Sequence, residues 1–222
     1  MFTGFTKETV DFLWGIALNN ERSWFLEHKE QYLQNLDAPM KELSVCVLDE
    51  MNKRHPELGL ITHVCRIYRD ARRLHGRGPY KDHLWFTLHH PHDRLEHTVC
   101  LYFEVAPNGF SYGCGYWDME AVTAAKLRVR IERDPKTLAK IVRKLNKSRF
   151  TLHGETYKRP KGDVGAMLNP WYNRKSISLD YADNCEGVFF TPQLADELVA
   201  GFEELLPLYC YLYSLPSDPD PK

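Results

Sequence analysis

The stretch that decides the fold runs from Thr98 to Trp117 and reads TVCLYFEVAPNGFSYGCGYW. Two runs rich in aromatic and β-branched residues, 98–105 and 110–117, flank the tetrapeptide Ala-Pro-Asn-Gly. Such runs are typical of β-strands, and a short segment that ends in Asn-Gly is typical of the turn between antiparallel strands. The stretch therefore predicts a β-hairpin, and with it an antiparallel sheet in the middle of the chain.

Sequence patterns outside this hairpin extend the sheet and surround it with helices. Further strands are predicted at 84–88 and near 176–179. Helical periodicity predicts three earlier helices, which begin after Thr6, after Asn20 and at Asp37. It predicts three later ones, at 119–132, after Asp134-Pro135, and from Thr191-Pro192 onward, the last kinked or ended by Pro207.

This order of elements predicts an α+β protein with N-terminal helices, a central antiparallel sheet and C-terminal helices. No repeat, low-complexity tract or linker divides the chain. We therefore expect a single α+β domain over residues 1–213, followed by a flexible C-terminal tail at 214–222.

The composition narrows the class of protein. The 222 residues include 29 Lys and Arg against 30 Asp and Glu, which gives a formal charge of −1 and argues against a general nucleic-acid or membrane-surface binder. No apolar run approaches the roughly 20 residues that span a bilayer. The N-terminus lacks the basic start and apolar run of a signal peptide. We expect a cytoplasmic protein with no membrane partner, whose six cysteines are buried, reduced thiols.

A strongly basic segment lies between Arg66 and Lys81. It reads RIYRDARRLHGRGPYK, with six cations and one acid, and carries a formal +5 although the whole chain carries −1. Like charges repel, so a fold that gathers them needs a negative partner, either its own carboxylates or an anionic ligand. Residues 62–68 favour a strand that leads into an arginine-lined loop, and a helix over the basic segment is the alternative.

This segment supplies most of the predicted anion-binding residues, which are Arg66, Arg69, Arg72, Lys81, Tyr80 and Arg22. If the chain is extended there, Arg66, Asp70 and Arg72 lie on one face. Asp70 could then orient one arginine and leave the other to bind a phosphate or carboxylate with two parallel hydrogen bonds. The alternative is an internal ion-pair network in which Glu21, Glu27 or Glu104 neutralises the arginines.

A second block, residues 19–32, reads NNERSWFLEHKEQY. Asn20 is expected to cap a helix, and the Trp-Phe pair is expected to enter the core. Arg22 and His28 could face the same cleft as the basic segment. His28 is a catalytic candidate because imidazole titrates near neutrality, and Asp70 is the other candidate, as an orienting group or a base. A surface or capping role is the alternative for His28.

Five histidines lie close together in the sequence and suggest a possible metal site: His83, His89, His90, His92 and His97. No carboxylate or cysteine completes a standard ligand spacing, so the sequence predicts no metal and identifies no cofactor. Gly113 and Gly115 lack the Gly-Lys-Ser/Thr ending of a phosphate loop, and we expect them to permit close packing of the backbone. The segment 157–162, YKRPKG, is a second basic loop, either solvated or part of an anion pocket.

The two blocks together resemble an uncharacterised family, domain of unknown function 2461. Its members show Asn-Asn-(basic)-x-Trp-Phe with a later His-Lys, then Arg-Ile-x-Arg-Asp-x-Arg, then Pro-Tyr-Lys. This chain has the corresponding blocks in that order, the first in the form Asn-Asn-Glu-Arg-Ser-Trp-Phe. The resemblance covers almost the whole chain and implies an α+β domain, but it brings no established activity, cofactor or catalytic residue. The chain differs from the family pattern at Arg73 and Arg77, so a shared ligand could be held differently.

The function that the sequence favours is binding of an anionic, phosphate- or carboxylate-bearing small molecule in an arginine-rich pocket. The protein could be an enzyme, but no nucleophile or metal set decides that question. Two alternatives belong to other classes. One is a nucleic-acid-binding module in which Tyr68 or Tyr80 stacks on bases, and the other is a domain that binds an acidic protein partner. The sequence leaves the oligomeric state open.

Overall fold

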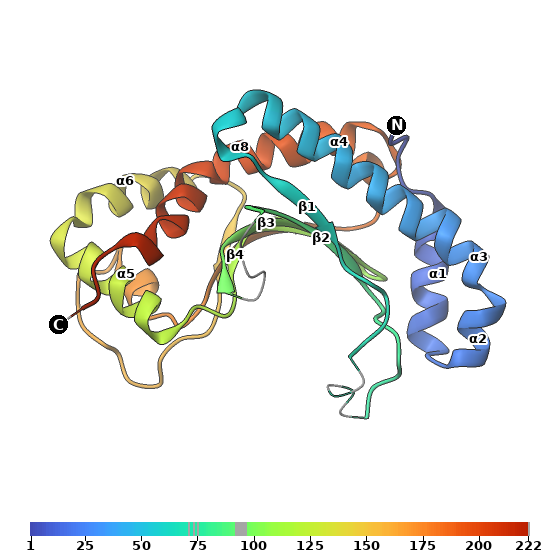
Figure 1. Cartoon of the computed structure of the whole chain (residues 1–222), viewed down its shortest axis with the longest axis horizontal. Coiled ribbons are helices and arrows are strands. Elements are labelled where there is room, and N and C mark those ends of the chain that lie inside the picture. Colours follow the sequence, from blue (N-terminus) through green and yellow to red (C-terminus); the bar gives the residue numbers. More distant parts are fainter. Residues whose placement is uncertain (71, 73, 75, 92–96, 222) are drawn as a thin grey trace. The chain divides into compact units, whose positions relative to one another are not determined.

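The computed structural model describes residues 1–70, 72, 74, 76–91 and 97–221 (Figure 1). Within these residues, six strands form one antiparallel sheet in the order β1-β2-β3-β4-β6-β5. The strands are β1 (Ile61–Val64), β2 (Leu84–His89), β3 (Cys100–Ala106), β4 (Gly109–Tyr116), β5 (Thr151–His153) and β6 (Ile177–Asp183). The predicted hairpin is confirmed, because β3 and β4 are neighbours joined at Pro107-Asn108. The predicted α+β class, with helices before and after the sheet, is confirmed as well.

The N-terminal region is helical, as the sequence predicts. Its elements are α1 (Lys7–Leu18), α2 (Arg22–Glu27), α3 (Lys29–Tyr32), the π-helical turn η1 (Leu33–Asp37), α4 (Ala38–Arg54) and the short η2 (Pro56–Leu58). Thr6 precedes α1 with extended backbone, and its N–H donates to Thr9 Oγ1 at 3.2 Å. That hydrogen bond fixes the start of the helix through a short polar side chain in its first turn.

The C-terminal region holds α5 (Ala121–Arg133), α6 (Pro135–Leu145), α7 (Asn169–Tyr172), η5 (Gly187–Phe190), α8 (Gln193–Tyr213) and η6 (Leu215–Ser217). The start of α6 follows the predicted rule, since Asp134 accepts a hydrogen bond from the Thr137 N–H and Pro135 occupies the first turn. Pro207 lies inside α8 and does not end it.

The chain forms two compact units. Unit 1 contains Met1–His90, Tyr102–Tyr112 and Ala182–Ala200. In it α4 contacts β1 and β2, while α1 contacts α3 and η1 (Figure 1). Its core is rich in aromatic rings, and Phe5 stacks on Phe189 with 4.7 Å between ring centroids. Both rings are buried, so this stack joins the N-terminal segment to the turn before α8.

Unit 2 contains Pro91–Leu101, Gly113–Tyr181 and Gly201–Lys222. In it α5 contacts α6, α7 and η6. Arg130 of α5 donates to Asp218 Oδ2 at 2.6 Å and to the Tyr211 carbonyl at 2.7 Å. Lys126 donates to the Pro216 carbonyl at 2.8 Å. Two cations of one helix thus contact the residues around and after the end of α8, the segment in which the predicted tail begins.

All six cysteines are free thiols. Cys46 and Cys210 are exposed and Cys185 is half-buried, so the expectation that every thiol is buried is wrong for these three. Burial raises the pKa of the Cys65 thiol to about 11, which keeps this thiol protonated and unreactive near neutral pH. In the part of the chain that the structure describes, no helix has the length and apolar character needed to cross a membrane.

Candidate functional site

The basic segment folds as a loop closed by one antiparallel bridge between Tyr68 and Tyr80. The Arg69 N–H donates to the Pro79 carbonyl at 2.8 Å, and the Lys81 N–H donates to the Ile67 carbonyl at 2.7 Å. We call residues 66–82 the basic hairpin. Residues 66–70 and 76–81 are not helical, so the helical alternative is wrong for these described residues. The predicted strand is shorter than expected, since β1 ends at Val64 before the chain pairs again at Tyr68. Residues 71, 73 and 75 of the predicted arginine-lined loop lie outside the described residues.

Asn20 fixes the second arm of the basic hairpin. Its side-chain amide donates to the Tyr80 carbonyl at 3.0 Å, and its Oδ1 accepts from the Tyr80 N–H at 2.9 Å. Gly78 makes this approach possible, because a Cβ on it would lie 2.2 Å from Asn20 Oδ1. The predicted capping role of Asn20 is wrong, since Glu21 is the N-cap of α2. Asn20 instead pairs with a backbone 60 residues away.

An aromatic cluster connects α2 to the same arm. Phe25 stacks on Tyr80 with 4.2 Å between ring centroids, and it forms a T-shaped pair with Tyr68 with 5.8 Å between ring centroids. Tyr80 is 4% exposed whereas Tyr68 is 48% exposed, so only Tyr68 offers much of its ring to solvent. Burial, together with the nearby Tyr68, raises the pKa of Tyr80, and the positive charge of Arg22 partly offsets that rise. The charge of Arg22 therefore reaches the hairpin from α2.

Arg69 is largely buried and is neutralised from within the hairpin. Its Nε donates to the Tyr80 carbonyl at 2.6 Å and its Nη2 to Asp82 Oδ1 at 3.0 Å. Partial burial favours a neutral Asp82, but hydrogen bonds from His83 and the backbone, with the charge of Arg69, hold the pKa of this carboxyl below its ordinary value. The acid that pairs with Arg69 is therefore Asp82, not one of the three glutamates that the sequence suggested.

Arg72 and Asp70 form a separate pair at the surface. Both oxygens of Asp70 accept from the guanidinium, at 3.1 Å from Nε and 2.7 Å from Nη2. Asp70 Oδ1 also accepts from the Arg72 N–H at 3.0 Å. The Arg72 side chain is 87% exposed, so this pair is screened by water and contributes little to stability. Asp70 thus orients Arg72, the first of the two roles that the sequence offers it.

Lys81 and Arg66 lie together without a carboxylate partner among the described residues. The Lys81 ammonium donates to the Arg66 and Tyr68 carbonyls and lies 4.9 Å from the centroid of the Trp85 ring. Burial is the main cause that lowers the pKa of Lys81, and the positive charges of Arg66 and Arg69 add to it. Arg66 is exposed, and its guanidinium makes no hydrogen bond or ion pair within the described part of the chain.

His28 is positioned by Trp24. The two rings stack with 4.0 Å between centroids, and His28 Nδ1 lies 2.8 Å from the Trp24 carbonyl oxygen. These contacts occupy one ring face and one ring nitrogen of His28 at the end of α2. The structure therefore brings Arg66, Arg69, Lys81 and Tyr80 together, with Arg22 within electrostatic range, and gives His28 contacts of its own on α2.

The other sequence motifs have structural partners. A Cβ on Gly113 would lie 1.9 Å from the Leu179 carbonyl oxygen, and one on Gly115 would lie 2.3 Å from the Trp117 ring. The expected close packing at both glycines is confirmed. Asn173 holds the second basic loop by accepting from the Lys161 N–H at 2.6 Å and donating to the Gly162 carbonyl at 3.1 Å. Among the described residues, which exclude His92, no three His, Cys, Asp or Glu side chains form a group that could hold a metal ion.

Comparison with known proteins addresses the family and not the activity. A family model described as "Conserved hypothetical protein (DUF2461)" matches residues 8–211, which include Asn20 and the whole basic hairpin. The chain belongs to this family. No curated protein matches the sequence. The DUF2461 family name carries no reaction, so the case for a function rests on the geometry of the site.

Sequence reasoning missed two residues of this site, Asp82 and Trp85. Asp82 directly follows Lys81 and is the nearest acid beyond the basic segment, so proximity along the chain was a usable signal. Trp85 is the second residue of β2, a segment that the sequence predicts to be a strand of the sheet. Its contact with Lys81 depends on how the hairpin meets β2, which no local pattern shows.

The pairing of Arg69 with Asp82 predicts a pH-dependent loss of stability. Asp82→Asn should lower the free energy of unfolding at pH 7 by about 1 kcal/mol, a modest value because the Asp82 side chain is half exposed. The folded-state pKa of Asp82 lies below its ordinary value, so its stabilisation is present above the ordinary pKa and is lost as the pH falls through the folded-state pKa. Urea unfolding of the unchanged protein and of Asp82→Asn from pH 7 to pH 3 measures the loss of stability and its dependence on pH. A difference between the two proteins that stayed constant over this range would contradict the prediction.

Proposed function

We propose that the basic hairpin binds an anionic small molecule that bears a phosphate or carboxylate group, in a cytoplasmic protein. The observation that carries the proposal is the excess of cations that remains after internal pairing. Among the described residues, Asp82 forms an ion pair with Arg69, and Asp70 forms one with Arg72. Arg66 has no partner there and the Lys81 ammonium contacts only backbone carbonyls and a ring.

The proposed roles follow from these contacts. Arg66 supplies an exposed guanidinium that can bind two oxygens of an anion in parallel. Lys81 adds a point charge whose partial burial strengthens its attraction to an anion. Asn20 and Arg69 support the site indirectly, because both hold the backbone at Tyr80. Asp70 and His28 stay candidates for proton transfer should the protein prove to be an enzyme.

Thermal stabilisation by anions tests the proposal. A ligand at about 100 times its dissociation constant stabilises the folded state by roughly 2.7 kcal/mol, which corresponds to a rise in Tm of about 5–10 °C for a chain of this size. Phosphate, nucleotides, sugar phosphates and dicarboxylates should be compared at fixed ionic strength, because salt alone screens the hairpin. We expect at least one to give such a rise.

Two variants assign the response to the hairpin. Arg66→Ala should remove most of the rise in Tm without lowering the Tm of the free protein, because no described residue pairs with this side chain. Arg77→Ala is the matched control, since Arg77 is also an exposed arginine of the hairpin but is not among the predicted anion-binding residues. The proposal fails if no anion stabilises the protein, or if Arg66→Ala keeps the full response.

The half-exposed ring of Tyr68 beside these cations favours nucleic-acid binding as the second candidate. Several phosphate contacts would make the affinity for a short single-stranded RNA fall steeply with salt, whereas a small-molecule site saturates at one ligand per chain. Titration of such an RNA at 50 and at 200 mM salt separates the two candidates, because six phosphate contacts to a single strand would lower the affinity roughly 300-fold over this range. A flat salt response would remove the nucleic-acid candidate.

A further inference from the structure

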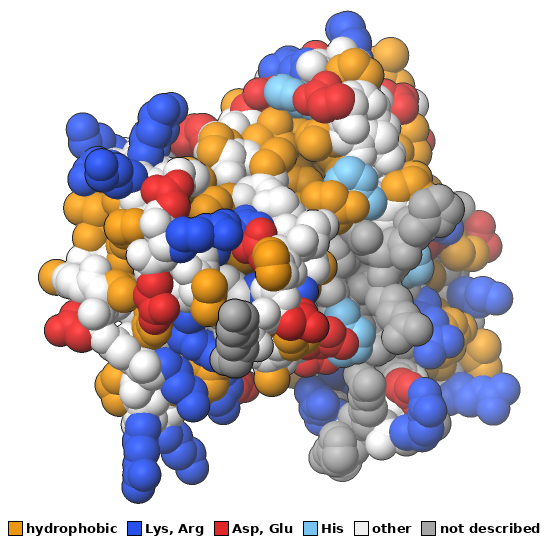
Figure 2. Space-filling view, turned by 60° about the vertical axis from the view of Figure 1, so that its left-hand side comes forward, with side chains coloured by type: hydrophobic (Ala, Val, Ile, Leu, Met, Phe, Trp, Pro, Cys, Tyr) orange, Lys and Arg blue, Asp and Glu red, His pale blue; other side chains and the backbone are white. Residues whose placement is uncertain are grey.

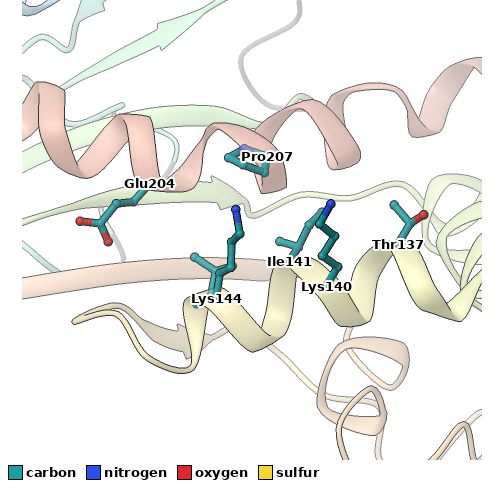
Figure 3. A pocket seen from close by; sticks show the side chains of 7 residues that line it. Thr137, Lys140, Ile141, Lys144, Glu204 and Pro207 are labelled. Atoms are coloured by element: carbon teal, nitrogen blue, oxygen red, sulfur yellow. The ribbon is translucent and has the colours of Figure 1, made fainter.

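A groove of about 350 Å³ lies between α6 and α8 in unit 2 (Figure 3). It is lined by Thr137, Lys140, Ile141, Lys144, Leu145, Glu204 and Pro207. The volume falls at the lower end of the range of roughly 300–1,000 Å³ that is typical of small-molecule sites. The groove is separate from the basic hairpin, which belongs to unit 1.

The groove has an apolar surface. Leu145 is buried, Ile141 is half-buried, and the ring of Pro207 faces α6 across the groove (Figure 3). The four methylenes of each lysine side chain add further apolar surface, because lysine packs its stem along hydrocarbon while its ammonium stays in water. An occupant with a hydrocarbon or aromatic portion would therefore remove apolar area from water on binding.

Two cations are directed into this space. Lys140 and Lys144 are four residues apart on α6, so they lie on one face of the helix, and Figure 3 shows both side chains extending toward α8. Within the described part of the chain, neither ammonium group makes a hydrogen bond or ion pair. The carboxylate of Glu204 is directed away from both ammonium groups (Figure 3). The positive charge in the groove is therefore not neutralised internally.

The segment that contains α6 is itself positive. Residues 135–147 contain five cations and no acid. Figure 2 shows lysine and arginine side chains gathered in clusters along the left-hand edge of the face it displays. Like charges four residues apart destabilise a helix, so an anion between Lys140 and Lys144 would relieve a repulsion that the free protein retains.

We propose that this groove binds a small amphiphilic anion, a single carboxylate attached to a short apolar chain. The carboxylate lies between the ammonium groups of Lys140 and Lys144, and the apolar chain lies against Ile141, Leu145 and Pro207. Glu204 opposes binding from the rim through its negative charge. The proposal does not depend on a ligand at the basic hairpin.

Octanoate is the probe, with acetate as the head group alone and octanol as the chain alone. Isothermal titration calorimetry should show one saturable octanoate site, with acetate and octanol each at least about tenfold weaker because each lacks half of the interaction. Amide chemical shifts on octanoate binding should change chiefly at residues 137–145 and 204–207. Arg66→Ala should bind octanoate as the unchanged protein does, which distinguishes this site from the basic hairpin.

Charge variants assign the site. Lys140→Gln with Lys144→Gln should weaken octanoate binding roughly tenfold, the sum of two exposed ion pairs. The matched control, Lys136→Gln with Lys147→Gln, removes the same charge from the same region outside the groove and should leave the affinity within about twofold. Glu204→Gln should tighten binding about two- to threefold, because it removes the opposing charge.

Three results would overturn the proposal. The first is the absence of saturable binding in the unchanged protein. The second is an equal loss in the two lysine pairs, which would mean that the basic face of α6 attracts anions without a site. The third is a set of shift changes outside the groove. If the Lys140 and Lys144 double variant failed to fold, the Glu204→Gln result would still decide, since a tighter affinity supports the proposal and an unchanged one contradicts it.

Discussion

Gly113→Ala is expected to destabilise the protein by about 3 kcal/mol or more. An added Cβ would lie 1.9 Å from the Leu179 carbonyl oxygen and 2.9 Å from the Asp180 Cα, both of which are backbone atoms of the neighbouring strand β6. A backbone that is held in a sheet cannot rotate away as a side chain can, so β4 and β6 would have to separate. Urea unfolding measures the loss of stability. If the loss is much larger than about 3 kcal/mol, we expect the yield of folded protein to fall.

Gly115→Ala is the matched control on the same strand. Its added Cβ would meet the ring of Trp117, 2.3 Å away, and this ring is half exposed and can change its rotamer. We expect a loss of about 1 kcal/mol, clearly below that of Gly113→Ala. Equal losses for the two variants would show that the contact with the β6 backbone is not what requires glycine at position 113.

The elements that the sequence predicts well are those with local causes. The β3–β4 hairpin follows from Asn-Gly between two aromatic runs, and α6 begins where Asp134-Pro135 predicts. Pro207 shows the limit of a local rule. A proline lacks the N–H of one helical hydrogen bond, but α8 continues to Tyr213 through it, with buried residues on both sides of Pro207. Burial of apolar side chains outweighs one lost hydrogen bond.

The candidate site was only partly predictable, because its contacts join residues that are far apart in the sequence. The concentration of arginines is visible in the sequence, and so is the need for carboxylates near them. Which carboxylates pair with the arginines depends on the bridge between Tyr68 and Tyr80, because that bridge brings Asp82 to Arg69. Asn20 was expected to cap a helix because local propensity favours that role. Its actual partner is the Tyr80 backbone, and no pattern within a window of the sequence contains both residues.

Asn20→Ala should lower the free energy of unfolding by about 2–3 kcal/mol, because it removes two hydrogen bonds from the partly buried backbone of Tyr80. The Tyr80 carbonyl still accepts from Arg69 Nε, so most of the loss comes from the Tyr80 N–H, which is left without an acceptor. The variant should also reduce the rise in Tm that an anion gives, since the arm that carries Lys81 is no longer fixed. Thermal and urea unfolding, with and without the stabilising anion, measure both effects.

Two further variants make the Asn20 prediction specific. Asn19→Ala is the control, because the Asn19 side chain makes one exposed hydrogen bond, to the Gly15 carbonyl, and its loss should change stability by no more than about 0.5 kcal/mol. Gly78→Ala should reproduce most of the Asn20→Ala loss, since its Cβ would displace Asn20 Oδ1. The double variant should then lose less stability than the sum of the two single losses, because both substitutions break the same contact. Full additivity would mean that Gly78 does not act through Asn20, and that the link between α2 and the basic hairpin is held by the ring stack of Phe25 on Tyr80 instead.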